Sequence, residues 1–235
     1  MKGVIYFDAE TAPKVQFYAD ADDYTKEYFE KKFSESNLTE KMTVAEFYEK
    51  KVSLYAEFSK IVCLVLATHI ADNNFKFKVL YSDKDNAVFS ETTLLTAFAE
   101  ILKKSSGILC GHNIKGFDIP FICKRFLANG LEIPSTLNPY GKKQWDVNHI
   151  DTMEVAKFGN YQGATSLDNL CHLLGIKSPK GDMDGSMVSQ VYHNSGEDGL
   201  NKIANYCVKD VEAAILVADR LVGGNKFKNN IKITF

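Results

Sequence analysis

The sequence predicts an α/β fold in which a mixed β-sheet is flanked by helices. Strand-like segments cluster in the first half, helical periodicity dominates the second half, and one strand-to-helix crossover lies near the middle. The 235 residues are 45% hydrophobic and 25% charged, which is typical of a globular chain with one buried core. We therefore expect residues 1–235 to form a single domain.

Apolar and β-branched segments predict the strands. Residues 61–68 are β-branched and apolar, which is typical of a buried strand, and residues 75–81 alternate as in a strand with one exposed face. Residues 107–110 predict a further short strand, which leads into residues 111–113. The predicted strands are 3–7, 61–68, 75–81, 107–110 and 147–150.

Apolar residues recur at helical spacing after the third strand and throughout the second half. Residues 92–104 end in two lysines, which favour the C-terminal end of a helix dipole. A further helix is expected to begin at Asp118, with Pro120 in its first turn. The predicted helices are 92–104, 118–130, 153–158, 166–174, 187–192 and 199–220.

Residues 13–51 separate the first strand from the second and are expected to be a helical insertion. The segment is rich in Tyr and Phe and poor in Gly and Pro, unlike a linker. It contains two amphipathic stretches, residues 22–33 and 43–54. In the second, Thr43 stands three residues before Glu46, the spacing of a capping box. The insertion has two possible roles, covering a cleft or forming a contact surface.

Charge and arginine content limit the possible nucleic-acid partners. The net charge of −2 argues against nonspecific coating of duplex DNA, whose affinity comes from cationic neutralisation of phosphates. Arg125 and Arg220 are the only arginines, so base-specific recognition through arginine forks is not expected. Lysine pairs such as Lys142 with Lys143, or Lys177 with Lys180, are candidates for phosphate contacts, although surface lysines are usually only solvated.

Cysteine usage and hydropathy favour a cytoplasmic protein. The five cysteines are scattered and contain no C-x-x-C pair, which argues against a disulfide framework or a structural zinc site. The chain starts without the pattern of a signal peptide. No apolar run approaches the roughly 18 residues that a membrane span requires.

The residues with the clearest chemical meaning form three clusters. Asp8 and Glu10 are two residues apart at the end of the first strand, so both side chains leave the same face. Asp118 stands where a helix begins. Tyr206 and Asp210 are four residues apart on the last helix and share a face.

Each cluster also has a structural explanation. Asp118 would be a stabilising N-cap, Tyr206 a core residue and Asp210 a surface residue. Together, three carboxylate motifs at the edges of regular elements describe a cage for two divalent ions. Carboxylate oxygens hold hard ions such as Mg²⁺ or Mn²⁺, and two such ions are suited to phosphodiester hydrolysis. Two further acids, Asp151 and Asp168, are expected to be structural.

The motifs resemble those of the DnaQ-like 3′–5′ exonucleases with four acidic residues and a tyrosine, the DEDDy group. The likeness is greatest to the proofreading exonuclease domain of family B DNA polymerases and its stand-alone relatives. It spans nearly the whole chain apart from the insertion, although no polymerase region is present. The residues that carry it are 7–11, 113–121, 150–153, 166–176 and 206–210.

The resemblance implies a ribonuclease H-like fold, with a five-stranded mixed sheet flanked by helices. It also implies roles for the acidic residues. Asp8 would bridge two divalent metal ions, Mg²⁺ or Mn²⁺, with Glu10 and Asp210 completing the first site. Asp118 would hold the second ion, and Tyr206 would orient the attacking water.

On the substrate side, the resemblance implies that Asn113 and Phe117 shape the cleft, with the Thr11 backbone near the terminal nucleotide. We therefore expect a metal-dependent 3′–5′ exonuclease that releases nucleoside monophosphates from single-stranded DNA. A 3′–5′ exoribonuclease is an open alternative, because the cage does not contact the 2′-hydroxyl that distinguishes RNA. A noncatalytic nucleic-acid-binding module on the same fold is another. Protein partners are unknown.

A sister subgroup uses a histidine five residues before its last aspartate. His193 and Asp198 have that spacing, but their segment is turn-like and offers no helical face. Tyr206 with Asp210 is therefore the preferred pair.

Overall fold

A mixed β-sheet forms the centre of the protein. The computed structural model describes residues 3–83, 86–105, 107–143, 146–160, 162–181, 183–227 and 230–235. Within these residues the sheet has six strands in the order β5-β4-β1-β2-β3-β6. β1, β2 and β3 are antiparallel neighbours, whereas β4, β5 and β6 are added in parallel. The strands are β1 (Val4–Pro13), β2 (Ser59–Ala71), β3 (Asn74–Tyr81), β4 (Ile108–Gly111), β5 (Ile150–Asp151) and β6 (Lys232–Thr234).

The sheet differs from the prediction at three strands. β1 continues to Pro13 instead of ending at Phe7, because its ladder with β2 persists to the pair Pro13–Ser59. β5 occupies the end of the expected segment and has only two residues. β6 makes six strands where five were expected, and its three residues pair with β3. A segment so short has no readable period, so its pairing with β3 defines it.

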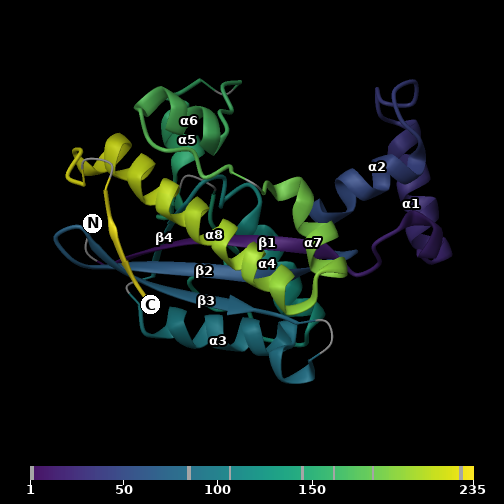
Figure 1. Cartoon of the computed structure of the whole chain (residues 1–235), viewed down its shortest axis with the longest axis horizontal. Coiled ribbons are helices and arrows are strands. Elements are labelled where there is room, and N and C mark those ends of the chain that lie inside the picture. Colours follow the sequence, from purple (N-terminus) through teal and green to yellow (C-terminus); the bar gives the residue numbers. More distant parts are fainter. Residues whose placement is uncertain are drawn as a thin grey trace.

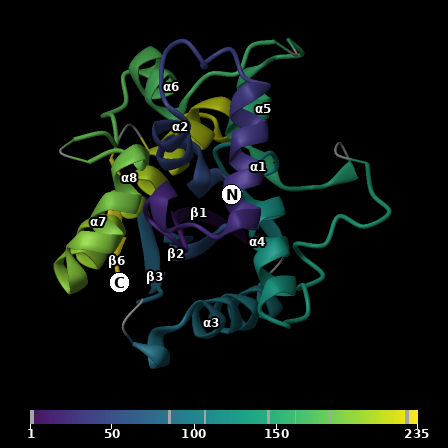
Figure 2. The same ribbon diagram turned by 90° about the vertical axis from the view of Figure 1, so that its right-hand side faces the viewer.

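Helices cover both faces of the sheet. Along β1 the side chains alternate: Val4 and Tyr6 join the core under α8, whereas Ile5 and Phe7 join the core under α3 and α4. Figure 1 shows α8 and α3 on opposite sides of the strands, and Figure 2 shows α4 on the side away from α7 and α8. The helices that follow β3 are η3 (Ala87–Phe89), α3 (Glu91–Lys103), α4 (Asp118–Ala128), α5 (Thr152–Ala156), α6 (Leu167–Leu174), η5 (Gly185–Met187), α7 (Val188–Asn194), α8 (Gly196–Ala218) and η6 (Asp219–Gly223).

The α-helices lie within a few residues of their predicted ranges because their ends carry local signals. Ser90 caps α3 and Ser166 caps α6, each accepting a backbone N–H of the first turn through its hydroxyl. α6 stops at Gly175, whose φ of 65° is the left-handed conformation that glycine adopts without strain.

The insertion connects the two strands of the β1–β2 hairpin, because Pro13 and Ser59 pair at its base. It contains η1 (Tyr18–Asp20), α1 (Asp23–Ser34) and α2 (Val44–Lys51), and η2 (Val52–Leu54) follows it directly. The predicted capping box of Thr43 and Glu46 is present at the start of α2. A separate small core centred on Phe29 and Tyr48 holds these helices together. Figure 1 shows α1 and α2 beyond the end of the strands.

The described residues contain no helix that is long and apolar enough to cross a membrane. The longest helix, α8, is amphipathic: Ile203 and Cys207 are buried, whereas Lys209 is exposed. This periodicity places Tyr206 and Asp210 at the half-buried margin of the face that packs on β1.

Candidate active site

β1 presents two of the predicted carboxylates to α8. Asp8 and Glu10 share the strand face of Tyr6, which packs in the core under α8. Both lie inside β1, so the prediction that they end a strand is wrong. Glu10 is 9% exposed and faces Cys63 across the ladder with β2, and Asp8 is half-buried.

Asp118 reaches β1 because β4 is short. β4 pairs with residues 4–6 of β1 and ends at Gly111. Backbone groups of β1 beyond this point can therefore form hydrogen bonds with a helix instead of a strand. There Ala9 donates its backbone N–H to Asp118 Oδ1 at 3.2 Å. The helix begins at Asp118 as predicted, but Phe117 is its N-cap, so the N-cap interpretation of Asp118 is wrong. The side chain is buried beside β1 instead.

The turn between β4 and α4 carries Asn113 and Phe117. Asn113 has a φ of 61°, a left-handed conformation that Asn tolerates better than most residues. Asp151, at the end of β5, accepts the backbone N–H groups of Asn113 at 2.8 Å and Lys115 at 2.9 Å. Asp151 therefore has a structural role, as predicted. The Phe117 ring lies 5.5 Å from the Phe121 ring, which places an aromatic pair at the start of α4.

α8 supplies the last two predicted residues. Tyr206 and Asp210 lie one turn apart on α8, close enough for the phenol to lower the pKa of the Asp210 carboxyl. Asp210 lies near enough to Asp8 for their charges to interact, which joins the α8 pair to β1. The Tyr206 hydroxyl also borders η5, 3.8 Å from where a Cβ on Gly185 would stand.

Burial raises the pKa of all four carboxyl groups, and repulsion from Asp8 adds to this effect in the other three. Burial raises the pKa of Asp8 to about 6, against the lowering effect of a hydrogen bond from Cys207. Burial and the charge of Asp8 raise the pKa of Asp210 to about 8. The pKa values of Glu10 and Asp118 lie well above their usual range, mainly through burial and the neighbouring charge of Asp8.

Three elements therefore bring four acids into one electrostatic cluster. Asp8 and Glu10 come from β1, Asp118 from α4 and Asp210 from α8. When ionised, the cluster has an excess of negative charge that divalent cations would neutralise. The donor oxygens are carboxylates, the type that Mg²⁺ and Mn²⁺ prefer. The side chains thus fit the ions that the sequence predicts.

Two further side chains, Cys207 and Lys180, lie beside the cluster. Cys207 Sγ lies 3.4 Å from both the backbone carbonyl oxygen and carboxylate Oδ2 of Asp8. Lys180, considered for a phosphate contact, pairs with Asp168 at 3.7 Å and lowers the pKa of Asp210. Cys207 stands between Tyr206 and Asp210 in sequence, which was the available signal for its proximity.

Thr11 and His193 are tied to backbone atoms near the base of the insertion. Thr11 Oγ1 donates to the carbonyl oxygen of Ser53 at 2.8 Å, and His193 Nε2 lies 2.9 Å from the carbonyl oxygen of Pro13. His193 belongs to α7 and Asp198 to the first turn of α8, so the expectation that their segment is turn-like is wrong. The two residues still lie on separate helices.

Two known polymerases are similar to part of the chain. A DNA polymerase of red sea bream iridovirus is 25% identical over 163 residues, which are 59% of this chain and 17% of that protein. The DNA polymerase delta catalytic subunit of Plasmodium falciparum (isolate K1 / Thailand) is 27% identical over 157 residues, 56% of this chain and 14% of that protein. The matched regions therefore span less than a fifth of either polymerase.

A solved structure has the same fold. The family B DNA polymerase from the hyperthermophilic archaeon Pyrobaculum calidifontis matches with a TM-score of 0.60 and 14% sequence identity. The match covers 93% of this chain and 24% of the polymerase. It confirms the predicted α/β fold of ribonuclease H type, a mixed sheet with flanking helices.

The family assignment rests on residues 52–222. This range matches a family described as predicted 3′–5′ exonucleases related to the exonuclease domain of PolB. It includes Asp118, Tyr206 and Asp210, and it begins after Asp8 and Glu10, which β1 places beside them. The chain belongs to this family of predicted 3′–5′ exonucleases, relatives of the exonuclease domain of family B DNA polymerases.

Proposed function

We propose that this protein is a metal-dependent 3′–5′ exonuclease that releases nucleoside monophosphates from the 3′ end of single-stranded DNA. Residues 1–235 act as one exonuclease domain in this proposal. The observation that carries it is the convergence of Asp8, Glu10, Asp118 and Asp210 into one cluster of carboxyl groups with raised pKa values. A purely structural or nucleic-acid-binding site has no need for such repulsion.

The four carboxylates would hold two divalent ions, Mg²⁺ or Mn²⁺. The chemistry that such ions supply when bound is neutralisation of the phosphate charge and a lower pKa for the attacking water. Asp8 would contribute to both ion sites, with Glu10 and Asp210 completing one and Asp118 the other. Their positions on a central strand and two packed helices would keep the donors in place without the substrate.

Tyr206 would position the nucleophile. Burial raises the pKa of its phenol far above neutrality, so the hydroxyl stays protonated. It lies beside Asp210 and, with its lone pairs, would accept a hydrogen bond from the attacking water. Its expected contribution is orientation, which adds to the rate without being needed to hold the ions.

The DNA strand would enter from the turn that carries Asn113 and Phe117. The half-buried ring of Phe117, which packs on the buried ring of Phe121, gives this turn an aromatic face on which a terminal base can stack without sequence preference. The Thr11 backbone would lie near the terminal nucleotide. The similar proteins named above are DNA polymerases, which favours DNA over RNA as the substrate.

The test uses DNA and RNA oligonucleotides labelled at the 5′ end, incubated with Mg²⁺, Mn²⁺ or a chelator. The wild type should give a descending ladder that requires the ion, and Asp8→Ala should reduce the rate by roughly a thousandfold or more. Asp198→Ala is the matched control, because Asp198 is an exposed acid on the same helix as Asp210. It should leave the ladder unchanged.

Three outcomes would contradict the proposal. Internal cleavage products would indicate an endonuclease, and equal rates for wild type and Asp8→Ala would exclude the carboxylate site. Binding of oligonucleotides without any hydrolysis would favour the noncatalytic module. A faster ladder on RNA would keep the site and change the substrate to RNA.

A further inference from the structure

Cys207 brings a sulfur atom into the carboxylate cluster. The ligand atoms of Asp8, Glu10 and Cys207 all lie within 4.8 Å of one another, although these residues come from β1 and α8. The thiol is completely buried and its Sγ is 3.4 Å from Asp8 Oδ2. The donor set here is therefore two carboxylates and one thiol, a mixture of hard and soft ligands.

Divalent ions differ in their affinity for such a mixed set of oxygen and sulfur ligands. Mg²⁺ takes oxygen ligands in octahedral geometry and has little affinity for sulfur. Zn²⁺ and Cd²⁺ are softer and accept thiolate together with carboxylate ligands. A site made of Asp8 and Glu10 alone would serve Mg²⁺ or Mn²⁺, whereas addition of Cys207 favours the softer ions.

The spacing is suitable for a tetrahedral ion. Two ligands that each lie about 2.0–2.3 Å from zinc are about 3.3–3.8 Å apart in a tetrahedral arrangement. The 3.4 Å distance from Cys207 Sγ to Asp8 Oδ2 already falls in this interval. Since the three ligand atoms all lie within 4.8 Å of one another, a small rotation of Glu10 would complete the set.

We propose that Asp8, Glu10 and Cys207 form a binding site for thiophilic divalent ions such as Cd²⁺ and Zn²⁺. Binding exchanges the S–H bond of Cys207 for a sulfur–metal bond, and the proton leaves to solvent. With Mg²⁺ the thiol keeps its proton and donates to Asp8. Ion binding stands independently of catalysis, whereas its consequence, inhibition of hydrolysis through capture of Asp8, rests on the proposed function.

The direct test is titration of the metal-free protein with Cd²⁺, followed through the sulfur-to-metal charge-transfer absorption in the ultraviolet. The wild type should develop this band at one equivalent of ion per chain. Cys207→Ser should lose the band and bind Cd²⁺ at least about tenfold more weakly. Asp8→Asn, which keeps the thiol, should also weaken Cd²⁺ binding.

Two other cysteine variants serve as controls. Cys63→Ser is the stringent one, because Cys63 contacts Cys207 in the same core. Cys123→Ser is the distant one, since Cys123 lies in α4 with its Sγ near the carbonyl oxygen of Leu137. Both should keep the band. Far-ultraviolet circular dichroism of each variant, and Cys207→Ala beside Cys207→Ser, separate loss of a ligand from loss of the fold.

The readouts distinguish this inference from the proposed function. A band that is absent in the wild type, or that survives in folded Cys207→Ser, overturns the thiophilic site whatever the nuclease activity. A band that depends on Cys207 in a protein that digests nothing with Mg²⁺ overturns the proposed function and keeps the site. If the thiophilic site and the proposed function are both correct, micromolar Cd²⁺ should stop the Mg²⁺-dependent ladder of the wild type. The ladder of Cys207→Ser should resist Cd²⁺.

Discussion

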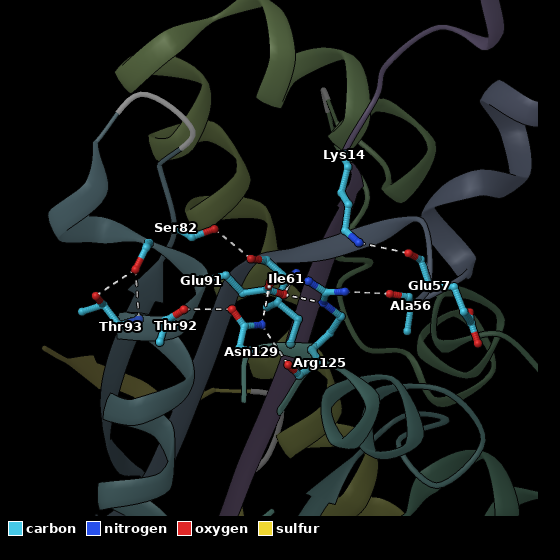
Figure 3. Close-up of polar contacts among 11 residues, drawn as sticks. Lys14, Ala56, Glu57, Ile61, Ser82, Glu91, Thr92, Thr93, Arg125 and Asn129 are labelled. Atoms are coloured by element: carbon cyan, nitrogen blue, oxygen red, sulfur yellow. Dashed lines mark hydrogen bonds and ion pairs between the residues drawn. The ribbon is translucent and has the colours of Figure 1, made fainter. Parts of the chain in front are cut away.

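Two glutamates of this protein are equally buried and have opposite surroundings. Glu10 and Glu91 are each 9% exposed. Glu91 accepts from Arg125 Nη2 at 2.6 Å, from Arg125 Nε at 2.9 Å, from the Ile61 backbone N–H at 2.8 Å and from Asn129 at 3.0 Å (Figure 3). Glu10 instead faces the carboxylates of Asp8 and Asp210, whose charges add to the effect of burial on its pKa.

The difference separates a structural acid from a candidate catalytic one. Around Glu91 the protein supplies the neutralising cation itself, because Arg125 forms a two-point pair with it and also bonds the Ala56 carbonyl oxygen at 2.9 Å. This network joins α3, α4 and the start of β2 beside the base of the insertion. Around Glu10, by contrast, a bound cation would have to neutralise the negative charge of the carboxylates.

Removal of Arg125 should produce the largest change in stability. Arg125→Met leaves Glu91 buried without its cation, which is expected to cost about 3–5 kcal/mol in the free energy of unfolding. Chemical denaturation measures this value. Lys124→Met is the matched control, because the neighbouring Lys124 forms an exposed pair with Glu57 and should contribute about 1 kcal/mol or less. Equal effects of the two changes would show that the Glu91 network does not have this structural role.

The carboxylate cluster should make the metal-free protein less stable at high pH. Asp8 and Asp210 have pKa values of about 6 and about 8 in the fold, against 3.8 for an unperturbed Asp. Between these limits the folded chain holds protons that the unfolded chain has lost. The free energy of unfolding should therefore fall as the pH rises from about 4 to about 8.

Thermal melts across this pH range, with and without Mn²⁺, measure the effect. Mn²⁺ should restore stability near pH 8, because ion binding replaces the lost protons as the source of positive charge. Asp210→Asn should reduce the pH dependence, since it removes one of the titrating groups. A metal-free wild type that is more stable at pH 8 than at pH 5 would contradict the raised pKa values.

Local patterns are sufficient to predict most elements and the identity of the candidate site. The capping box of Thr43 and Glu46, the alternation that places Asp8 and Glu10 on one face, and the spacing of Tyr206 and Asp210 all involve neighbours in sequence. The contacts that assemble the site do not. The Ala9–Asp118 hydrogen bond joins residues 109 positions apart, and the Cys207–Asp8 contact spans 199.

Dependence on contacts between distant residues also explains the wrong strand predictions and why the sequence did not reveal the Glu91–Arg125 pair. β1 extends past Phe7 because β2 continues to pair with it, and three-residue β6 exists because β3 has an edge beside it. Glu91 and Arg125 are 34 residues apart on different helices, so no periodicity connects them. Such features depend on packing between distant segments, which a single sequence does not encode as a local pattern.

Tyr206→Phe tests whether the phenol assists the cluster or only packs against it. The change removes one hydroxyl and keeps the ring, so the fold and ion binding should be nearly unaffected. Turnover of a 5′-labelled oligonucleotide should fall roughly 10–100-fold if the hydroxyl orients water. Calorimetric titration with Mn²⁺ separates the two effects. An unfolded variant would assign Tyr206 to the core, and unchanged turnover would remove its catalytic role.

Lys180 is a cation beside the carboxylate cluster, as Arg125 is beside Glu91, but its interaction with the acids is weaker. Its ammonium is 3.7 Å from Asp168, its side chain is 54% exposed, and it lowers the pKa of Asp210. An exposed cation in this position can approach the phosphate of a bound strand without neutralising the acids permanently. Lys180→Met should therefore raise the KM for an oligonucleotide a few-fold, with a smaller change in kcat, and should reduce the dependence of KM on salt.

Lys177→Met is the control for this last effect. Lys177 is an exposed lysine three residues away, and its charge acts on Glu212 instead of Asp210. If KM rises only in Lys180→Met, the position of the ammonium beside Asp210 is responsible. If both variants raise KM equally, the lysines act through the general charge of this segment, and the analogy with Arg125 fails. In either case the contrast with Glu91 predicts that neither lysine change lowers the free energy of unfolding by more than about 1 kcal/mol.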